Sequence, residues 1–102
     1  MTWEYIAGFF NREGSVVYNG KGFRATICQT NREVLEKIGE FCGMGHVCQV
    51  AKRKPHWKDS WVFYISKQNE VYGFLKGVFP FVIVKRNKIS RVLPKLDRIL
   101  KS

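Results

Sequence analysis

The chain has 102 residues, which is enough for one domain with a hydrophobic core and too few for two. Lysine and arginine outnumber aspartate and glutamate by 18 to 8, and the resulting formal charge of +10 is spread along the whole chain. This balance predicts a folded protein that binds a polyanion, with a merely soluble basic surface as the plainer alternative. No stretch has the length of a membrane span, and the N-terminus has no secretory signal. We therefore expect no membrane partner, and we expect no small-molecule substrate either.

The three cysteines, Cys28, Cys42 and Cys48, are odd in number and contain no CxxC pair. Each lies beside hydrophobic residues in the chain. This pattern favours reduced, buried thiols and predicts an intracellular protein in a reducing compartment.

Residues 3–13 are predicted to form a helix with one bulky face and one flat face. At helical spacing, one side carries the large residues Ile6, Phe9 and Phe10. Another side carries the smaller residues Ala7, Gly8 and Asn11. The bulky face suits a hydrophobic core, whereas the flat face allows another helix to come close.

Glu13 falls in the last turn of this helix, just before Gly14. The helix dipole places partial negative charge there, so an isolated carboxylate is disfavoured unless it has another function. A bound metal ion would provide that function. The alternative is that Glu13 caps a loop or pairs with a basic neighbour, and the residues alone leave both interpretations open.

Two β-prone segments follow, at residues 14–19 and 23–29. Between them, Asn19 and Gly20 predict a tight turn, because both central positions of such a turn favour positive φ. The second segment alternates between apolar and solvent-facing positions. Its apolar positions are Phe23, Ala25 and Ile27, and its solvent-facing positions are Arg24, Thr26 and Cys28.

A second helix is predicted to begin with a capping box formed by Thr30 and Glu33, in which each side chain bonds the other residue's backbone N–H. Gly43 is expected to end this helix in the left-handed conformation. The expected buried stripe comprises Val34, Leu35, Ile38, Phe41 and Cys42. We interpret this helix as structural.

The remaining chain predicts another hairpin and two helices. Strands are expected within residues 45–53 and 60–65, with a basic turn at residues 52–58. A helix over residues 69–79 is closed by Pro80, and a final helix begins at Lys85 with a kink or restart at Pro94. The order is α-β-β-α-β-β-α with a further C-terminal helix, which predicts one α+β domain covering residues 1–102.

Residues 6–14, IAGFFNREG, resemble the LAGLIDADG motif of homing endonucleases. The later segments ICQTNREVLEKIGEF, GMGHV and FLKGVFPFVIVKRNK are similar in order and spacing to those of the single-motif members of that family. The resemblance implies a curved, four-stranded antiparallel sheet with helices on one face. It also implies a homodimer that uses Mg²⁺ or Mn²⁺ to cleave double-stranded DNA at a long, near-palindromic site, as in intron homing.

The same resemblance assigns the residues of the active site. Glu13 is the expected metal-binding and catalytic acid, and the backbone carbonyl of Arg12 is a further metal ligand. Gln29 and Lys85 are expected at the edge of the site, where they organise water and steady charge. Arg32, just beyond Gln29, is a candidate for the same basic pocket.

The family pattern also implies that two motif helices meet at a two-fold axis. Ala7, Gly8 and Asn11 are the residues expected at this interface. The motif departs from the family at two positions, because Asn11 replaces the usual first acid and Arg12 replaces a residue that is commonly small. Arg12 would place positive charges close together if it pointed into the interface, or it could reach a DNA phosphate.

In the family, the solvent face of the sheet lies along the major groove of DNA. Strand parity and the two basic hairpin tips then predict which residues contact the DNA. These are Ser15, Asn19, Lys21, Arg24, Thr26, Arg32, Lys52, Lys54, Lys58, Ser60 and Tyr64, with Val17, Cys28, Cys48, Val50 and Val62 on the same faces. A register shift of one residue would exchange the two faces of either hairpin.

Two other functions remain open at this point. One is a non-catalytic nucleic-acid-binding protein of the same fold, such as an intron maturase or a DNA-binding regulator. The other is a basic structural protein that coats nucleic acid without sequence preference. The joint presence of Glu13, Gln29 and Lys85 favours the endonuclease over the first of these.

Overall fold

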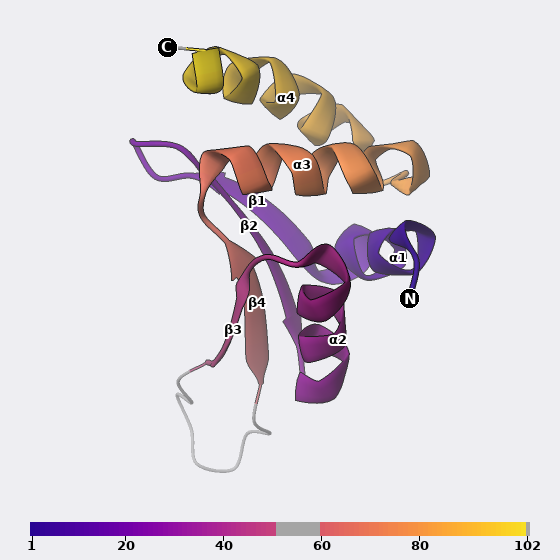
Figure 1. The fold of residues 1–102 in the computed structure, drawn as a ribbon. Coiled ribbons are helices and arrows are strands. Elements are labelled where there is room, and N and C mark those ends of the chain that lie inside the picture. Colours follow the sequence, from indigo (N-terminus) through magenta and orange to yellow (C-terminus); the bar gives the residue numbers. More distant parts are fainter. Residues whose placement is uncertain (51–59, 102) are drawn as a thin grey trace.

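The computed structural model describes residues 1–50 and 60–101. Within these residues the chain forms one four-stranded sheet and four α-helices (Figure 1). In chain order the elements are α1 (Trp3–Glu13), β1 (Gly14–Tyr18), β2 (Phe23–Gln29), α2 (Arg32–Cys42), β3 (His46–Gln49), β4 (Trp61–Ile65), α3 (Gln68–Val78), the 3₁₀ turn η1 (Phe79–Phe81) and α4 (Arg86–Lys101). None of the helices in the two described ranges is long and apolar enough to cross a membrane.

The strands follow the order β1-β2-β4-β3, and every neighbouring pair is antiparallel. The two hairpins, β1-β2 and β3-β4, are joined into one sheet by the pairing of β2 with β4. Helices α1, α2 and α3 pack on one face of the sheet, and α4 packs on α3 (Figure 1). The predicted α+β architecture, with helices on one face of an antiparallel sheet, is therefore confirmed.

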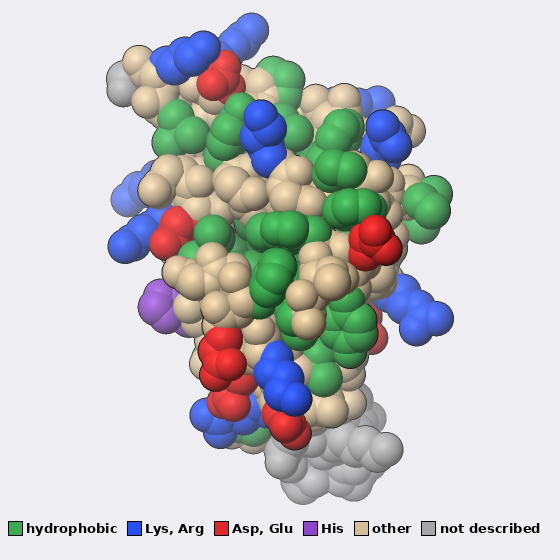
Figure 2. Space-filling view, turned by 45° about the vertical axis from the view of Figure 1, so that its right-hand side comes forward, with side chains coloured by type: hydrophobic (Ala, Val, Ile, Leu, Met, Phe, Trp, Pro, Cys, Tyr) green, Lys and Arg blue, Asp and Glu red, His purple; other side chains and the backbone are tan. Residues whose placement is uncertain are grey.

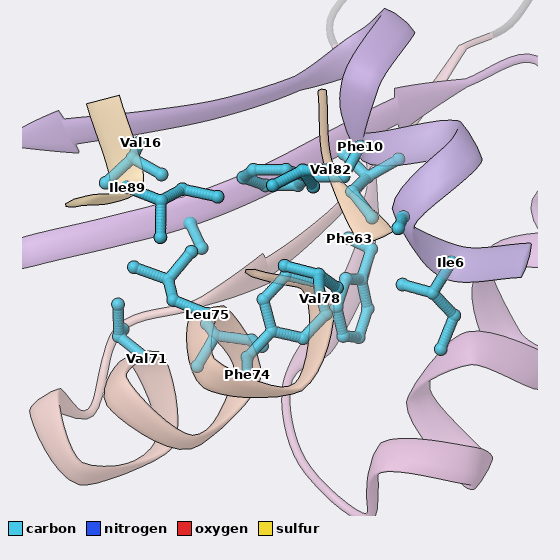
Figure 3. Packing of buried hydrophobic residues seen from close by; sticks show 14 of the residues in the cluster. Ile6, Phe10, Val16, Phe63, Val71, Phe74, Leu75, Val78, Val82 and Ile89 are labelled. Carbon is cyan, nitrogen blue, oxygen red and sulfur yellow. The ribbon is translucent and has the colours of Figure 1, made fainter. Parts of the chain in front are cut away.

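The core lies between the sheet and the helices. Figure 3 shows Val16 and Phe63 of the sheet together with Phe74 and Val78 of α3 and Ile89 of α4. All five side chains are almost completely removed from water, which is the main favourable contribution to folding. Side chains on the other face of the sheet are half-buried or exposed. We call this surface the open face; its residues are Ser15, Val17, Arg24, Thr26, Cys28, His46, Cys48, Val62 and Tyr64.

The two faces of α1 differ from the expectation. The buried side is formed by Ile6, Ala7 and Phe10, each with no exposed area. Ala7 was predicted on the flat outer side, but its small side chain lies within the core, where α1 packs against β2. Phe9 was predicted in the core, and it packs against the edge of the core while remaining only half-buried. Its ring also contacts the exposed ring of Tyr5, with the ring centroids 5.2 Å apart.

The predicted turn between β1 and β2 and the predicted N-terminal cap of α2 also take a different form. The loop between β1 and β2 has four residues, and only Gly20 has a positive φ, of 92°. Asn19 contributes through its side chain, because Oδ1 accepts hydrogen bonds from the N–H groups of Lys21 and Gly22, both at 3.0 Å. At the start of α2, the cap is Asn31 rather than Thr30, and its Oδ1 accepts from the N–H of Val34 at 3.4 Å.

The end of α2 was predicted correctly, because Gly43 adopts φ 67° and its N–H bonds the carbonyl of Gly39. The expected stripe of α2 is only partly buried. Leu35 and Ile38 are fully buried, whereas Phe41 is 42% exposed and packs its ring against Trp3.

The last helix does not restart at Pro94, since α4 runs continuously from Arg86 to Lys101 with Pro94 inside it. Proline removes one backbone hydrogen bond, but Val92 and Leu96 on either side are buried and hold the helix in place. The prediction of buried cysteines was wrong for Cys28 and Cys48, which are exposed. Both lie at positions of their strands that face outward, on the open face, whereas Cys42 is half-buried.

Candidate active site and nucleic-acid interface

Glu13 and Gln29 meet where α1 ends and β2 ends. Glu13 is the last residue of α1, and β1 begins directly after it. Because Gly14 pairs with Ile27 across the hairpin, the start of β1 lies beside the end of β2. The Nε2 atom of Gln29 donates a hydrogen bond to Oε2 of Glu13 at 3.1 Å.

The orientation of the Gln29 amide is fixed by its neighbour Thr30. Oε1 of Gln29 accepts hydrogen bonds from the backbone N–H of Thr30 at 2.8 Å and from its hydroxyl at 3.2 Å. The Nε2 group is thereby directed at Glu13. Both side chains line a hollow of about 400 Å³ together with Thr30, Cys28 and Ser60.

The oxygen atoms at this hollow are suited to a divalent cation. Carboxylate, carbonyl and hydroxyl oxygens are the ligands that Mg²⁺ and Mn²⁺ prefer. In the described part of the chain, Glu13 forms no ion pair with a lysine or arginine, and no three acidic, histidine or cysteine side chains lie close enough to hold a metal. Among the described residues that line the hollow, Glu13 is therefore the one that carries a carboxylate.

Lys85 lies near the same end of α1. Its Nζ donates to the backbone carbonyl of Asn11 at 3.4 Å. The side chain of Asn11 holds the preceding segment, because Oδ1 accepts from the N–H groups of Ile83 and Val84 at 3.0 and 3.3 Å. The structure thus attaches Lys85 to α1 at Asn11, two residues before Glu13. Among the described contacts, no direct bond joins the side chains of Lys85 and Glu13.

The outward side of α1 carries Tyr5, Gly8, Phe9 and Arg12, which follow helical spacing. These residues and Glu13 line a shallow hollow of about 330 Å³. Of the three residues predicted at a two-fold interface, only Gly8 lies on this exposed side. Ala7 is buried in the core, and the side chain of Asn11 is committed to residues 83 and 84.

On the open face, Ser15, Thr26, Tyr64 and His46 lie side by side across all four strands. The guanidinium of Arg24 lies over the ring of Tyr64, at 4.2 Å from its centroid. Its Nε atom is buried without a hydrogen-bond partner among the described residues. His46 was missed in the sequence, although it has the same strand parity as Cys48, and its ring lies 5.5 Å from that of Tyr64.

The other predicted DNA contacts occupy different settings. Lys21 is exposed at the tip of the first hairpin, where Asn19 uses its side chain to close the loop. Arg32 pairs with Glu36 at 2.7 Å and stacks on Trp61 at 4.6 Å from the ring centroid. Ser60 is half-buried at the hollow beside Glu13. Lys52, Lys54 and Lys58 lie outside the described residues.

Comparison with known proteins gives no matching family model and no matching curated sequence. Solved structures do match. An archaeal intron-encoded homing endonuclease complexed with DNA, I-Vdi141I, has a TM-score of 0.75 and 26% identity, over 98% of this chain and 69% of that one. The homing endonuclease I-CvuI has a TM-score of 0.70 and 19% identity, over 95% of this chain and 66% of that one. That structure holds the I-CreI target in the presence of 2 mM Mg, with the DNA not cleaved.

A third structure is the LAGLIDADG meganuclease I-CpaMI bound to uncleaved DNA, with a TM-score of 0.70 and 21% identity. It covers 99% of this chain, which spans 39% of that protein. The structural neighbours thus agree with the resemblance of residues 6–14 to the family motif. The chain has the fold of the LAGLIDADG homing endonucleases.

Proposed function

We propose that this protein is a sequence-specific, double-strand DNA endonuclease of the homing type that works as a homodimer. The observation that carries the proposal is the contact between Glu13 and Gln29 at the end of the motif helix. It places a carboxylate that pairs with no lysine or arginine of the described residues in a hollow that Gln29, Thr30 and Ser60 also line, within a fold whose solved neighbours include DNA complexes. Two copies packed through the outward side of α1 would bring two Glu13 carboxylates to one site.

In this proposal each residue at the hollow has a separate role. The carboxylate of Glu13 and the backbone carbonyl of Arg12 hold a divalent cation, Mg²⁺ or Mn²⁺. When bound, such a cation neutralises charge on the scissile phosphate and provides an activated water. Gln29 fixes the orientation of the Glu13 carboxylate through its 3.1 Å hydrogen bond, and its amide can also position water.

Lys85 is proposed to steady the negative charge that develops on the phosphate. We expect Lys85→Met to slow cleavage more than it weakens DNA binding, because a positioned charge acts most strongly when the reacting phosphate gains charge. Single-turnover cleavage and equilibrium binding, measured on one duplex, provide the comparison. Equal losses in both would instead identify Lys85 as an ordinary phosphate contact.

The open face is proposed to lie in the major groove. Its width of four strands and its mixture of hydroxyl, guanidinium, imidazole and phenol groups suit the reading of base edges. Arg24 is already held over Tyr64, so its remaining donors are presented with little loss of side-chain entropy. The exposed Lys21 would contact the backbone at the end of the hairpin.

Cleavage of a randomised duplex library tests the proposed function. We expect Mg²⁺-dependent cutting of a small, related set of long sequences, with near-palindromic symmetry if two copies act together. A non-catalytic maturase or regulator would bind a preferred sequence without cutting it. A protein that coats nucleic acid would show no preferred sequence and a steep dependence on salt.

The non-catalytic alternative is favoured by one feature, the position of Arg12. Its side chain lies on the outward side of α1, one turn after Gly8. Two helices packed through this side would bring two guanidinium groups close together, which disfavours the dimer unless each reaches a phosphate or an acid. The library experiment separates the two functions, because only the endonuclease cuts.

The cysteines provide a test of the DNA-binding surface without any substitution. Cys28 and Cys48 flank Val62 across the open face and are exposed. Burial raises the pKa of the Cys42 thiol to about 11, so roughly one molecule in a thousand carries a Cys42 thiolate at pH 8. We therefore expect alkylation at Cys28 and Cys48, little at Cys42, and protection of the first two by saturating DNA.

Mass spectrometry of peptides that each contain one cysteine measures the three rates separately. Cys42 is the internal control, because its slow reaction should not change when DNA is added. If Cys28 and Cys48 react equally fast with and without saturating DNA, the open face is not the binding surface.

A further inference from the structure

Helix α4 carries a line of cations that the proposed site does not use. Lys88, Arg91, Lys95 and Arg98 follow one another at intervals of three, four and three residues, which places them on one side of the helix. All four are exposed, and within the described ranges none pairs with an acid. Asp97, the sole acid of α4, instead pairs with Lys101 at 3.1 Å. We call these four residues the α4 stripe.

The α4 stripe adjoins the first hairpin. Lys95 and Arg98 line a hollow of about 330 Å³ together with Tyr18 and Phe23, the residues at which β1 ends and β2 begins. In Figure 1 this hairpin ends near the start of α3, below the C-terminal end of α4. Figure 2 shows lysine and arginine side chains at the top of the molecule, where α4 lies. Lys21 adds a further exposed cation at the tip of the same hairpin.

The length and charge of the α4 stripe fit duplex DNA. From Lys88 to Arg98 the helix rises about 15 Å, at 1.5 Å per residue. The same length of duplex axis carries roughly nine phosphate charges. No acid interrupts the stripe, so a polyanion that approaches it meets attraction along its whole length.

We propose that the α4 stripe binds the phosphate backbone of duplex DNA that continues past the end of the sheet. This inference rests on the proposed function, because it requires DNA on the open face. Cations at this spacing contact phosphates without reading bases. The stripe therefore adds affinity for DNA that flanks the recognised site, and it adds no sequence preference.

The test compares two duplexes that contain the same target. One ends where the target ends, and the other continues for one helical turn on each side. We expect the wild type to bind the longer duplex more tightly, and we expect Lys95→Gln/Arg98→Gln to lose this advantage. On the longer duplex, the slope of log affinity against log salt should become shallower by about 3.6 in the variant, because each of the two copies loses two phosphate contacts and each lost contact removes about 0.9.

A control variant, Lys37→Gln/Lys76→Gln, removes the same charge from exposed positions on α2 and α3. It should keep the preference of the wild type for the longer duplex. Equal wild-type affinity for both duplexes, or equal losses on both in the stripe variant, would overturn the inference and leave the proposed function intact. Failure of the wild type to bind either duplex would overturn both.

Discussion

Replacing Glu13 with glutamine is expected to abolish cleavage while DNA binding remains. Glutamine keeps an oxygen that can accept the hydrogen bond from Gln29, so the local structure is preserved. It removes the negative charge that a divalent cation requires at this position. We expect the single-turnover cleavage rate to fall by about 10²–10³-fold or more, the scale on which loss of one group that stabilises transition-state charge acts.

Binding of the same duplex, measured without divalent metal, should be unchanged or slightly tighter, because the variant carries one negative charge fewer near the phosphates. Glu4→Gln is the matched control, since Glu4 is an exposed acid in the first turn of the same helix and lies at its opposite end. It should cut at the wild-type rate. Cleavage by the Glu13 variant at a rate near that of the wild type would exclude Glu13 as the metal-binding acid.

The strands of this protein could be predicted from the sequence because their burial alternates with a period of two. In β2, Phe23, Ala25 and Ile27 are buried, and the residues between them face outward. The same alternation in β4 buries Phe63 and Ile65. One register satisfies both hairpins, so the open face follows from the pattern alone.

The faces of α1 could not be predicted from residue size. A helix that lies close to a sheet needs small residues on its buried side, so Ala7 is in the core and Phe9 is displaced outward. The sequence shows where the small and large residues of α1 fall, but it does not show how closely the helix approaches the sheet. Figure 2 shows hydrophobic side chains exposed in a band on the face where α1 lies, which the size pattern alone does not predict.

Polar contacts between distant parts of the chain also could not be predicted from the sequence. Asn11 reads as a departure from the motif, yet its Oδ1 holds the backbone of residues 83 and 84, more than 70 positions away. Gln68 likewise donates and accepts hydrogen bonds at both backbone groups of Phe23. Such contacts depend on the complete fold, because no local pattern distinguishes a side chain that bonds a distant backbone from one that bonds water.

The second prediction with a large expected effect tests the proposed homodimer. A β-carbon built at Gly8 meets no atom within 4 Å, and Gly8 lies on the outward side of α1. Gly8→Gln should therefore leave the monomer folded, but a longer side chain prevents the approach to about 8–10 Å that packed helices need. We expect the mass in solution to fall from two chains to one, and cleavage to be lost, because each chain supplies one Glu13.

Gly73→Gln provides the matched control on α3, because Gly73 is also exposed and a β-carbon there also meets nothing within 4 Å. This change should keep the dimer and raise the free energy of unfolding by about 0.5 kcal/mol through helix propensity. Far-UV circular dichroism of the Gly8 variant should show an intact helical signal. Unfolding is then excluded as the cause of the lost cleavage. A Gly8 variant that remains a two-chain species and cuts at the wild-type rate would place the two-fold contact elsewhere. A wild type that remains one chain with and without DNA would exclude a site shared between two copies.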